Sequence, residues 1–315
     1  LLYDIDKEAA IRNEKIGNSI PENNFVYKAV DSLKEALTGA DFVIISILPG
    51  TFDEMQSDVH APEEYGIYQS VGDTTGPGGI LRAIRTIPMY IEIAQAIEKY
   101  SPNAWVINYT NPMSMCVETL YKVFPNIKAF GSCHEVFFEQ KIMCEILREF
   151  LGIEGLDRHD IKTNIIGLNH FTWINKATYK GIDIMPLYHK FADKYQEDGF
   201  YSEAIKVVST LAVYAPSNKG ASKLRIDLFR RFGVVAAAGD RHLAEFCPGY
   251  WYLKDPETVE KWGFFLTTVD YRRKLQAKRL AQAERFISGK EKFEIIPTGE
   301  EGVSQMKALM GLGDI

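Results

Sequence analysis

The feature that most constrains the fold is a regular alternation of short apolar segments and longer amphipathic segments along the first half of the chain. The apolar runs are bounded by turn-forming residues and predict β-strands at residues 25–30, 41–48, 105–109 and 127–131. Apolar residues at helical spacing predict helices at residues 7–17, 31–37, 80–100, 113–123 and 136–151. Because strands and crossover helices alternate, we expect an α/β fold with a Rossmann-like, mostly parallel sheet and helices on both faces.

The pattern changes after about residue 160. Residues 161–168 and 171–179 are two neighbouring β-rich runs, and the spacing beyond them is mostly helical, at residues 185–195, 224–232 and 271–288. A second, α+β domain explains this change. We therefore expect a Rossmann-like domain at residues 1–160 and an α+β domain at residues 161–315.

Composition argues against two classes of partner. The net charge of -6 and the pI near 5.6 lead us to expect neither nucleic acid nor an anionic membrane as a partner. No apolar run approaches the roughly 18 residues of a membrane-spanning helix, and no basic and apolar leader is recognised. The four cysteines lack the spacing of a disulfide framework or a zinc finger, and a functional thiol favours a reducing, cytoplasmic compartment.

Residues 1–6 resemble the end of a strand with an acidic residue, Asp4, at its carboxyl edge. In a dinucleotide-binding fold, the second strand carries such an acid, which contacts the adenosine ribose. The glycine-rich turn of that fold precedes the acid by roughly 20–30 residues. We therefore expect the first strand with its glycine loop, and the C-terminal part of the substrate domain, to be missing from this sequence. The alternative is that Asp4 simply ends an edge strand.

Two motifs place metal-binding side chains directly after apolar segments. Cys133 and His134 follow residues 127–130, and His170 follows residues 161–168. Open α/β sheets bind ligands beyond the carboxyl ends of their strands, and a thiolate and an imidazole are both good metal ligands. Two protein ligands would leave positions free for a substrate. The alternative is a buried free cysteine with hydrogen-bonded histidines.

Two other segments lie at the starts of helices. Asn-Tyr-Thr-Asn-Pro at 108–112 joins a strand to a helix, where Asn and Thr also serve as simple caps. Gly-Pro-Gly-Gly at 76–79 precedes a helix that carries Arg82 and Arg85. This segment is either an anion cradle or only a loop.

Asp240 lies in the otherwise apolar stretch 234–246, next to Gly239. A carboxylate in such a context needs either partners or a chemical role. As a structural alternative, Asp240 would form a buried ion pair with Arg241 or Arg231.

The order of these motifs is more specific than any one of them. The acid after a strand is followed by Ser-Ile-Leu-Pro-Gly at 46–50, Gly-Pro-Gly-Gly at 76–79, Asn-Tyr-Thr-Asn-Pro at 108–112, Gly-Ser-Cys-His at 131–134, Gly-Leu-Asn-His at 167–170 and Ala-Gly-Asp-Arg-His at 238–242. In this order the chain resembles glycoside hydrolase family 4, the NAD- and divalent-metal-dependent glycosidases, over nearly its whole length. Residues 133–135, 170–173 and 240–246 resemble the α-galacturonidase branch of that family.

The resemblance implies a redox-assisted elimination in place of the usual two-carboxylate hydrolysis. NAD+ takes a hydride from C3 of the sugar, a base removes the acidified proton on C2, and the group on C1 leaves. Water then adds, and the hydride returns to C3. The resemblance also implies a metal, Mn2+ or another divalent ion, which holds the oxygens on C2 and C3 and stabilises the enolate. The substrate would be a galacturonide or a related small sugar.

The resemblance assigns each role to a residue of this sequence. Cys133 and His170 match the metal ligands. Asp240 matches the base, and His134 is the candidate acid, with Glu135 as the second choice. The candidate cofactor contacts are Asp4, Ile47, Pro49 and Asn108, and the candidate substrate contacts are Asn111, Arg85 and Asn169.

Several alternatives stay open. A uronate carboxylate favours a bidentate guanidinium, which Arg241, Arg225 or Arg85 could supply. Tyr214 would replace Asp240 as the base if a variant at Asp240 stayed active. An NAD-dependent 2-hydroxy-acid dehydrogenase of the lactate and malate type would share the two-domain fold without using a metal. A non-catalytic NAD-binding sensor is the second rival, and a homodimer or homotetramer is the expected assembly.

Overall fold

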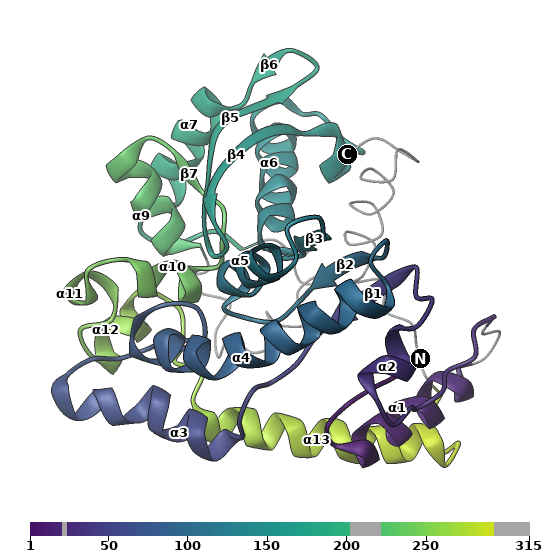
Figure 1. Ribbon diagram of the computed structural model, residues 1–315. Coiled ribbons are helices and arrows are strands. Elements are labelled where there is room, and N and C mark those ends of the chain that lie inside the picture. Colours follow the sequence, from purple (N-terminus) through teal and green to yellow (C-terminus); the bar gives the residue numbers. More distant parts are fainter. Residues whose placement is uncertain (21–23, 202–221, 293–315) are drawn as a thin grey trace. The chain divides into compact units, whose positions relative to one another are not determined.

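The computed structural model describes residues 1–20, 24–201 and 222–292. By their internal contacts, these residues form two compact units. Unit 1 comprises the described residues of 1–55, 82–131 and 269–292, and unit 2 comprises those of 56–81 and 132–268. Each unit is assembled from separate stretches of chain, and the domain boundary expected at residue 160 falls inside unit 2. Figure 1 labels the helices and strands.

Unit 1 contains the predicted parallel sheet. Its strands β1 (Phe42–Ile45), β2 (Trp105–Asn108) and β3 (Lys128–Gly131) lie in the order β1-β2-β3, and both pairings are parallel. Asn108 pairs with Ile45 on one side and with Gly131 on the other, so the three strands end together. The strand expected at 25–30 is reduced to a single parallel bridge between Leu2 and Ala29.

The described helices of unit 1 are α1 (Lys7–Ser19), α2 (Leu33–Leu37), α5 (Met113–Val123) and α13 (Val269–Ile287), together with part of α3 (Phe52–His60) and most of α4 (Gly76–Tyr100). Helices α2, α4 and α5 pack on the sheet through one apolar core. Tyr90, Val106 and Leu120 lie at the centre of the core and are fully buried. Ser32 caps α2 by accepting a hydrogen bond from the Glu35 N–H.

Unit 2 is built on an antiparallel sheet. The long strands β4 (Lys162–Leu168) and β5 (Phe171–Tyr179) form a hairpin, and β5 also pairs with β6 (Ile182–Asp183) and β7 (Val235–Ala236). The two β-rich runs predicted from the sequence are therefore confirmed as neighbours in one sheet.

Helices of unit 2 bury the sheet in two apolar clusters. The elements are 3-10 helix η1 (Ala61–Tyr65), α6 (Glu135–Leu151), 3-10 helix η2 (Arg158–Asp160), α7 (Met185–Tyr195), α9 (Lys223–Phe232), α10 (Asp240–Phe246), α11 (Gly249–Tyr252) and α12 (Pro256–Lys261). One cluster centres on Ile146, Ile174 and Phe229, and the other on Leu228, Leu243 and Tyr252. The α3, α10, α11 and α12 helices were not predicted from the sequence.

Within the described ranges, no helix is both long enough and apolar enough to cross a membrane.

Candidate active site

The β4–β5 turn of unit 2 presents His170. Leu168 pairs with Phe171, so the turn contains only Asn169 and His170, and His170 has a φ of 61°. A left-handed backbone is unfavourable for a residue with a Cβ atom, and such residues cluster at functional sites. The His170 side chain is buried, and its Nδ1 lies 2.9 Å from Thr74 Oγ1.

The Thr74 hydroxyl fixes the tautomer of His170. Thr74 Oγ1 donates its single hydrogen to Asp73 Oδ1 over 2.8 Å, so the same oxygen must accept the hydrogen bond from His170 Nδ1. His170 therefore carries its proton on Nδ1, and Nε2 keeps a bare lone pair. An imidazole binds a metal in this form, with its other nitrogen oriented by a neighbouring group.

A second histidine joins His170 and Asp73. One potential ligand atom on each of Asp73, His170 and His242 lies within 4.8 Å of the other two. The two imidazole rings stack with 3.6 Å between their centroids. His242 Nδ1 is buried and has no hydrogen-bond partner among the described residues, and its Nε2 lies 3.9 Å from Glu135 Oε1. Burial lowers the pKa of both imidazoles, to about 4 for His242, so both are neutral at pH 7.

The loop that carries Asp73 is fixed to helix α10, which carries His242. Glu245 Oε1 accepts hydrogen bonds from the backbone N–H groups of Val71 and Gly72, at 2.7 Å each. Hydrogen bonds to a carboxylate are roughly twice as strong as neutral ones. Glu245 therefore holds together two parts of the site that are far apart in the sequence.

Glu135 lies close to the same histidines, whereas the Cys133 thiol does not belong to the group of ligand atoms that lie within 4.8 Å of one another. Burial opposes the charge of Glu135, but His242 and His170 outweigh it in the acid range where they are protonated, and the pKa of Glu135 falls to about 2. Burial, with a further contribution from the Glu135 charge, raises the pKa of Cys133 to about 12. The thiol therefore keeps its proton at pH 7 unless a metal displaces it.

Asp240, the first residue of α10, belongs to a buried charge network. Its Oδ1 lies 3.2 Å from Arg225 Nε, and its Oδ2 accepts a hydrogen bond of 3.0 Å from the Leu224 N–H. Arg225 Nη1 also donates to Glu139 Oε2 over 3.0 Å, and Glu139 Oε1 accepts from the Tyr188 hydroxyl at 2.7 Å. Burial raises the pKa of Asp240 above its ordinary value in spite of Arg225, which suits a residue that must take up a proton.

The arginines that the sequence left unranked have different surroundings. Arg225 is buried between Glu139 and Asp240, so its charge is already shared by two carboxylates. Arg241 Nη1 donates to Thr267 Oγ1 over 2.8 Å. Asp240 is thus ion-paired, but with Arg225, whereas the sequence suggested Arg241 or Arg231 as its partner.

Two other predicted residues of unit 2 flank Cys133. His134 is the residue before α6 and is exposed. The partly buried Asn169 hydrogen-bonds the Cys133 thiol through its side chain. The predicted residues Cys133, His134, Asn169, His170 and Asp240 therefore all belong to unit 2, as do Asp73 and His242.

In unit 1, Asn108 shapes the segment that follows β2. Its side chain is fully buried, with Oδ1 accepting from the Tyr90 hydroxyl and from the Thr110 N–H, and with Nδ2 donating to the Thr110 carbonyl. Thr110 Oγ1 in turn accepts a hydrogen bond of 2.9 Å from the Ile47 N–H, which follows β1. The ends of β1 and β2 are tied together by these contacts.

The remaining predicted residues of unit 1 lie near the same strand ends. Asn111 accepts a hydrogen bond on its carbonyl from Arg82 Nε at 3.0 Å, and its buried Oδ1 has no hydrogen-bond partner in the described part of the chain. Pro49 is buried, and a Cβ atom placed on Gly50 would lie 3.6 Å from the Arg85 side chain. Asn111 Oδ1 is therefore a buried polar atom available to a ligand.

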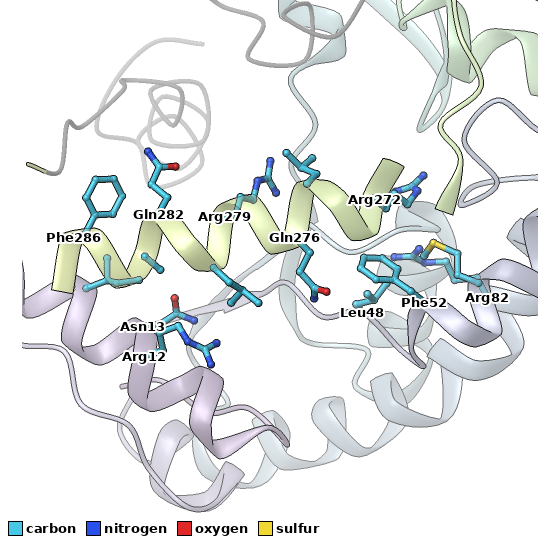
Figure 2. Close-up of a pocket in the computed structure, with 15 residues that line it drawn as sticks. Arg12, Asn13, Leu48, Phe52, Arg82, Arg272, Gln276, Arg279, Gln282 and Phe286 are labelled. Carbon is cyan, nitrogen blue, oxygen red and sulfur yellow. The ribbon is translucent and has the colours of Figure 1, made fainter. Parts of the chain in front are cut away.

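A pocket of about 580 Å³ lies within unit 1, a volume typical of small-molecule sites. Figure 2 shows α13 along one side of the pocket, with Arg12 and Asn13 on α1. Leu48 and Phe52 lie near the end of α13 that carries Arg272. Four arginines and no acidic residue line it, the arginines being Arg12, Arg82, Arg272 and Arg279. Its lining therefore favours an anionic group.

Two predicted positions give little structural information. Asp4 is exposed, and its Oδ1 accepts a hydrogen bond from the Asp6 N–H. Tyr214 lies outside the described residues.

Two residues of the site, Asp73 and His242, were not singled out from the sequence. The only sequence signal for them was polar side chains beside glycines, in Gly-Asp-Thr-Thr-Gly at 72–76 and Gly-Asp-Arg-His at 239–242.

Comparison with known proteins places both halves of the chain in one family. The model described as family 4 glycosyl hydrolase matches residues 1–149, and the model of the family 4 glycosyl hydrolase C-terminal domain matches residues 165–314. An α-galacturonidase of Thermoanaerobacterium saccharolyticum is 59% identical over 319 residues, an alignment that covers 100% of this chain and 68% of that protein.

Solved structures agree with this placement. The protein lplD of Bacillus subtilis is 49% identical, with a TM-score of 0.88 over 99% of this chain and 70% of its own. A 6-phospho-α-glucosidase from gut microorganisms, solved with NAD and Mn2+, is 20% identical and has a TM-score of 0.73 over 97% of this chain and 66% of its own. The second likeness shows the fold alone.

Proposed function

Because this chain belongs to family 4 of the glycosyl hydrolases, we propose that it hydrolyses α-galacturonides. The observation that carries the choice of sugar is the 59% identity, along the whole chain, to a protein named α-galacturonidase. A further protein of that name, from Bacillus subtilis, is 50% identical over 314 residues. The buried group of two neutral imidazoles, a thiol and carboxylates in unit 2 supports the same proposal, because it combines metal donors with a candidate base.

We infer that unit 1 holds NAD+. The residues fit it because the pocket beyond Leu48 offers four arginines to an anionic group such as a pyrophosphate. In this proposal Asp4 contacts the ribose, and Ile47, Pro49 and Asn108 form the groove beside the strand ends. NAD+, when bound, supplies reversible oxidation at C3 of the sugar.

We infer that Cys133 and His170 hold a divalent metal, Mn2+ first. The residues fit a metal because the Thr74 hydroxyl leaves His170 Nε2 with a bare lone pair. A bound divalent ion supplies Lewis-acid stabilisation to the oxygens on C2 and C3. Asn169 supports the thiol, and Asn111 and Arg85 contact the substrate.

In this proposal Asp240 is the base that removes the C2 proton. Its raised pKa makes it more basic than an ordinary aspartate, and Arg225 and the Leu224 N–H fix both carboxylate oxygens in place. His134, exposed beside Cys133, donates the proton to the leaving oxygen, with Glu135 as the second choice. The pKa of about 2 makes Glu135 a poor acid at neutral pH, which favours His134.

The test is an assay with an aryl α-galacturonide, NAD+ and Mn2+, followed by analysis of both sugar and cofactor. We expect cleavage without net accumulation of NADH, and in D2O we expect deuterium at C2 of the product. A 2-hydroxy-acid dehydrogenase would instead accumulate NADH with a hydroxy acid, and a sensor would do neither. Cleavage that leaves C2 without deuterium would exclude the elimination route.

We also propose that the protein acts as a homodimer or homotetramer in the cytoplasm, where a reducing environment keeps the Cys133 thiol available. Light scattering of the purified chain tests the assembly, and a monomer at all concentrations would contradict it.

A further inference from the structure

We propose that Asp73 and His242 complete the metal site, so that a divalent cation is held by a carboxylate and two imidazoles in addition to Cys133. This inference rests on the proposed function, since it specifies the ligand set of the same site. Two histidines and one carboxylate form a recurrent set for divalent first-row metals and leave coordination positions open. Those positions suit the neighbouring oxygens of a sugar.

The distances support a shared ion. The three ligand atoms of Asp73, His170 and His242 lie within 4.8 Å of one another. Three ligand atoms bound at about 2.1 Å from one metal lie roughly 3.0–3.6 Å apart at angles of about 90–120°, so a closure of on the order of 1–2 Å brings all three onto one cation. Such a shift lies within ordinary side-chain adjustment in a packed site.

The hydrogen bonds orient these side chains for metal binding. Thr74 accepts the Nδ1 proton of His170 and donates to Asp73, so one hydroxyl positions two of the three ligands. His242 has its Nε2 toward Glu135 and its buried Nδ1 without a partner in the described part of the chain. A buried nitrogen without a hydrogen bond is costly, and a cation would satisfy it. A carboxylate behind a metal-bound histidine is the usual outer partner.

Charge also favours a cation here. Asp73 and Glu135 lie near both histidines. Among the described residues, the negative charges of these two carboxylates oppose the lowering of the pKa of His170 and of His242, so the field at the site favours positive charge. As a carboxylate ligand, Asp73 would contribute a negative charge to the site.

The experiment measures binding of Mn2+ alone to the metal-free full chain by equilibrium dialysis with metal analysis. We expect Asp73→Asn and His242→Gln each to weaken Mn2+ binding at least about 100-fold. Loss of a residue that only hydrogen-bonds a metal ligand usually costs about 10–100-fold, so a larger loss indicates direct coordination. Thr74→Val should cost about 10–100-fold as an outer partner, and Thr74→Ser, which keeps the hydroxyl, should restore binding. His189→Gln, at an exposed position of α7, is the matched control and should bind as the parent does.

Pulsed electron paramagnetic resonance of the Mn2+-loaded parent provides a readout that needs no variant to fold. We expect nitrogen couplings from two coordinated imidazoles; a single imidazole would overturn the proposal. The proposed ligand set would likewise be overturned if folded Asp73→Asn and His242→Gln bound Mn2+ as tightly as the parent while Cys133→Ser lost Mn2+ binding. That outcome would leave the proposed function intact. Conversely, two bound imidazoles without cleavage of any galacturonide would uphold the site and reject the proposed function.

Discussion

Asp240 and Arg225 form a buried ion pair, with 3.2 Å between Asp240 Oδ1 and Arg225 Nε. Arg225 also binds Glu139 at 3.0 Å, so a single guanidinium lies between two carboxylates. From the sequence, Asp240 was either the catalytic base or half of a buried ion pair. Both are compatible with this arrangement, because an aspartate in an ion pair can still act as a base when its cationic partner is shared with a second carboxylate.

For Asp240→Asn we expect turnover to fall by about 10²–10⁴-fold, the usual contribution of general base catalysis. Stability should change little, because Asn keeps an acceptor for the Leu224 N–H and Arg225 stays paired with Glu139. Steady-state kinetics and urea denaturation give the two numbers. Asp227→Asn, which loses a more exposed ion pair with Arg231, is the control for turnover. A destabilised but fully active Asp240→Asn would move the base to another residue, Tyr214 being the first to test.

Replacement of Arg225 by Met should destabilise the protein strongly. It leaves Asp240 and Glu139 as two buried carboxylates without a counter-charge, a loss that costs about 3–5 kcal/mol. Adding Glu139→Gln should recover part of this cost, because only one carboxylate then remains unpaired. Equilibrium denaturation of the single and double variants measures the coupling. Arg230→Met, whose contact with Asp193 is exposed and 3.9 Å long, should cost only about 0–1 kcal/mol.

Gly239→Ala tests how closely α10 approaches Glu135. A Cβ atom at 239 would lie 2.9 Å from Glu135 Oε2, closer than such contacts are tolerated, so the Glu135 carboxylate beside His242 must shift. We expect weaker Mn2+ binding and lower turnover, with a stability loss of about 1–3 kcal/mol from overpacking. Gly249→Ala is the control, since no atom lies within 4 Å of its Cβ position. Wild-type metal affinity in Gly239→Ala would show that Glu135 is not needed to orient His242.

The buried thiols predict a loss of stability at alkaline pH. Burial raises the pKa of Cys116 to about 11 and that of Cys144 to about 12, whereas an unfolded cysteine titrates near 8.5. A folded pKa above the unfolded one gives stability that is complete below about pH 8.5 and is lost as the pH rises towards the folded values, by about 1.4 kcal/mol per pH unit for each thiol. Denaturation at a series of pH values should show this decline, and it should be shallower in Cys144→Ala. An identical slope in both proteins would contradict the assignment to this thiol.

Sequence periodicity was enough to predict the elements whose apolar pattern is long. The three parallel strands of unit 1 and the β4–β5 hairpin of unit 2 follow from runs of buried residues, as does helix α6. The strand expected at 25–30 fails, because Phe25 and Val26 are 74% and 87% exposed and only Ala29 forms a bridge. Apolar composition alone does not supply a pairing partner.

The candidate site was only partly predictable for a different reason. His170 follows a strand, so its position could be inferred from the sequence. Asp73 comes from a loop whose position depends on Glu245, and His242 faces the site because Asp240 starts the helix that carries it. Contacts of this kind join residues that are far apart in the chain, and no local pattern records them.

The interleaving of the two units has a consequence for how the protein is made. Helix α13 packs on α1, and Glu284 lies 4.0 Å from Arg12, yet Val269 follows Ser19 by 250 residues. At a translation rate of about 5–20 residues per second, α1 waits on the order of 10–50 s for its partner to leave the ribosome. By the end of that interval unit 2 has been synthesised through Thr268, while unit 1 still lacks α13. Premature termination before Val269 would therefore yield a chain in which α1 has lost the helix that packs on it, and we expect such a chain to be a target for chaperones or proteases.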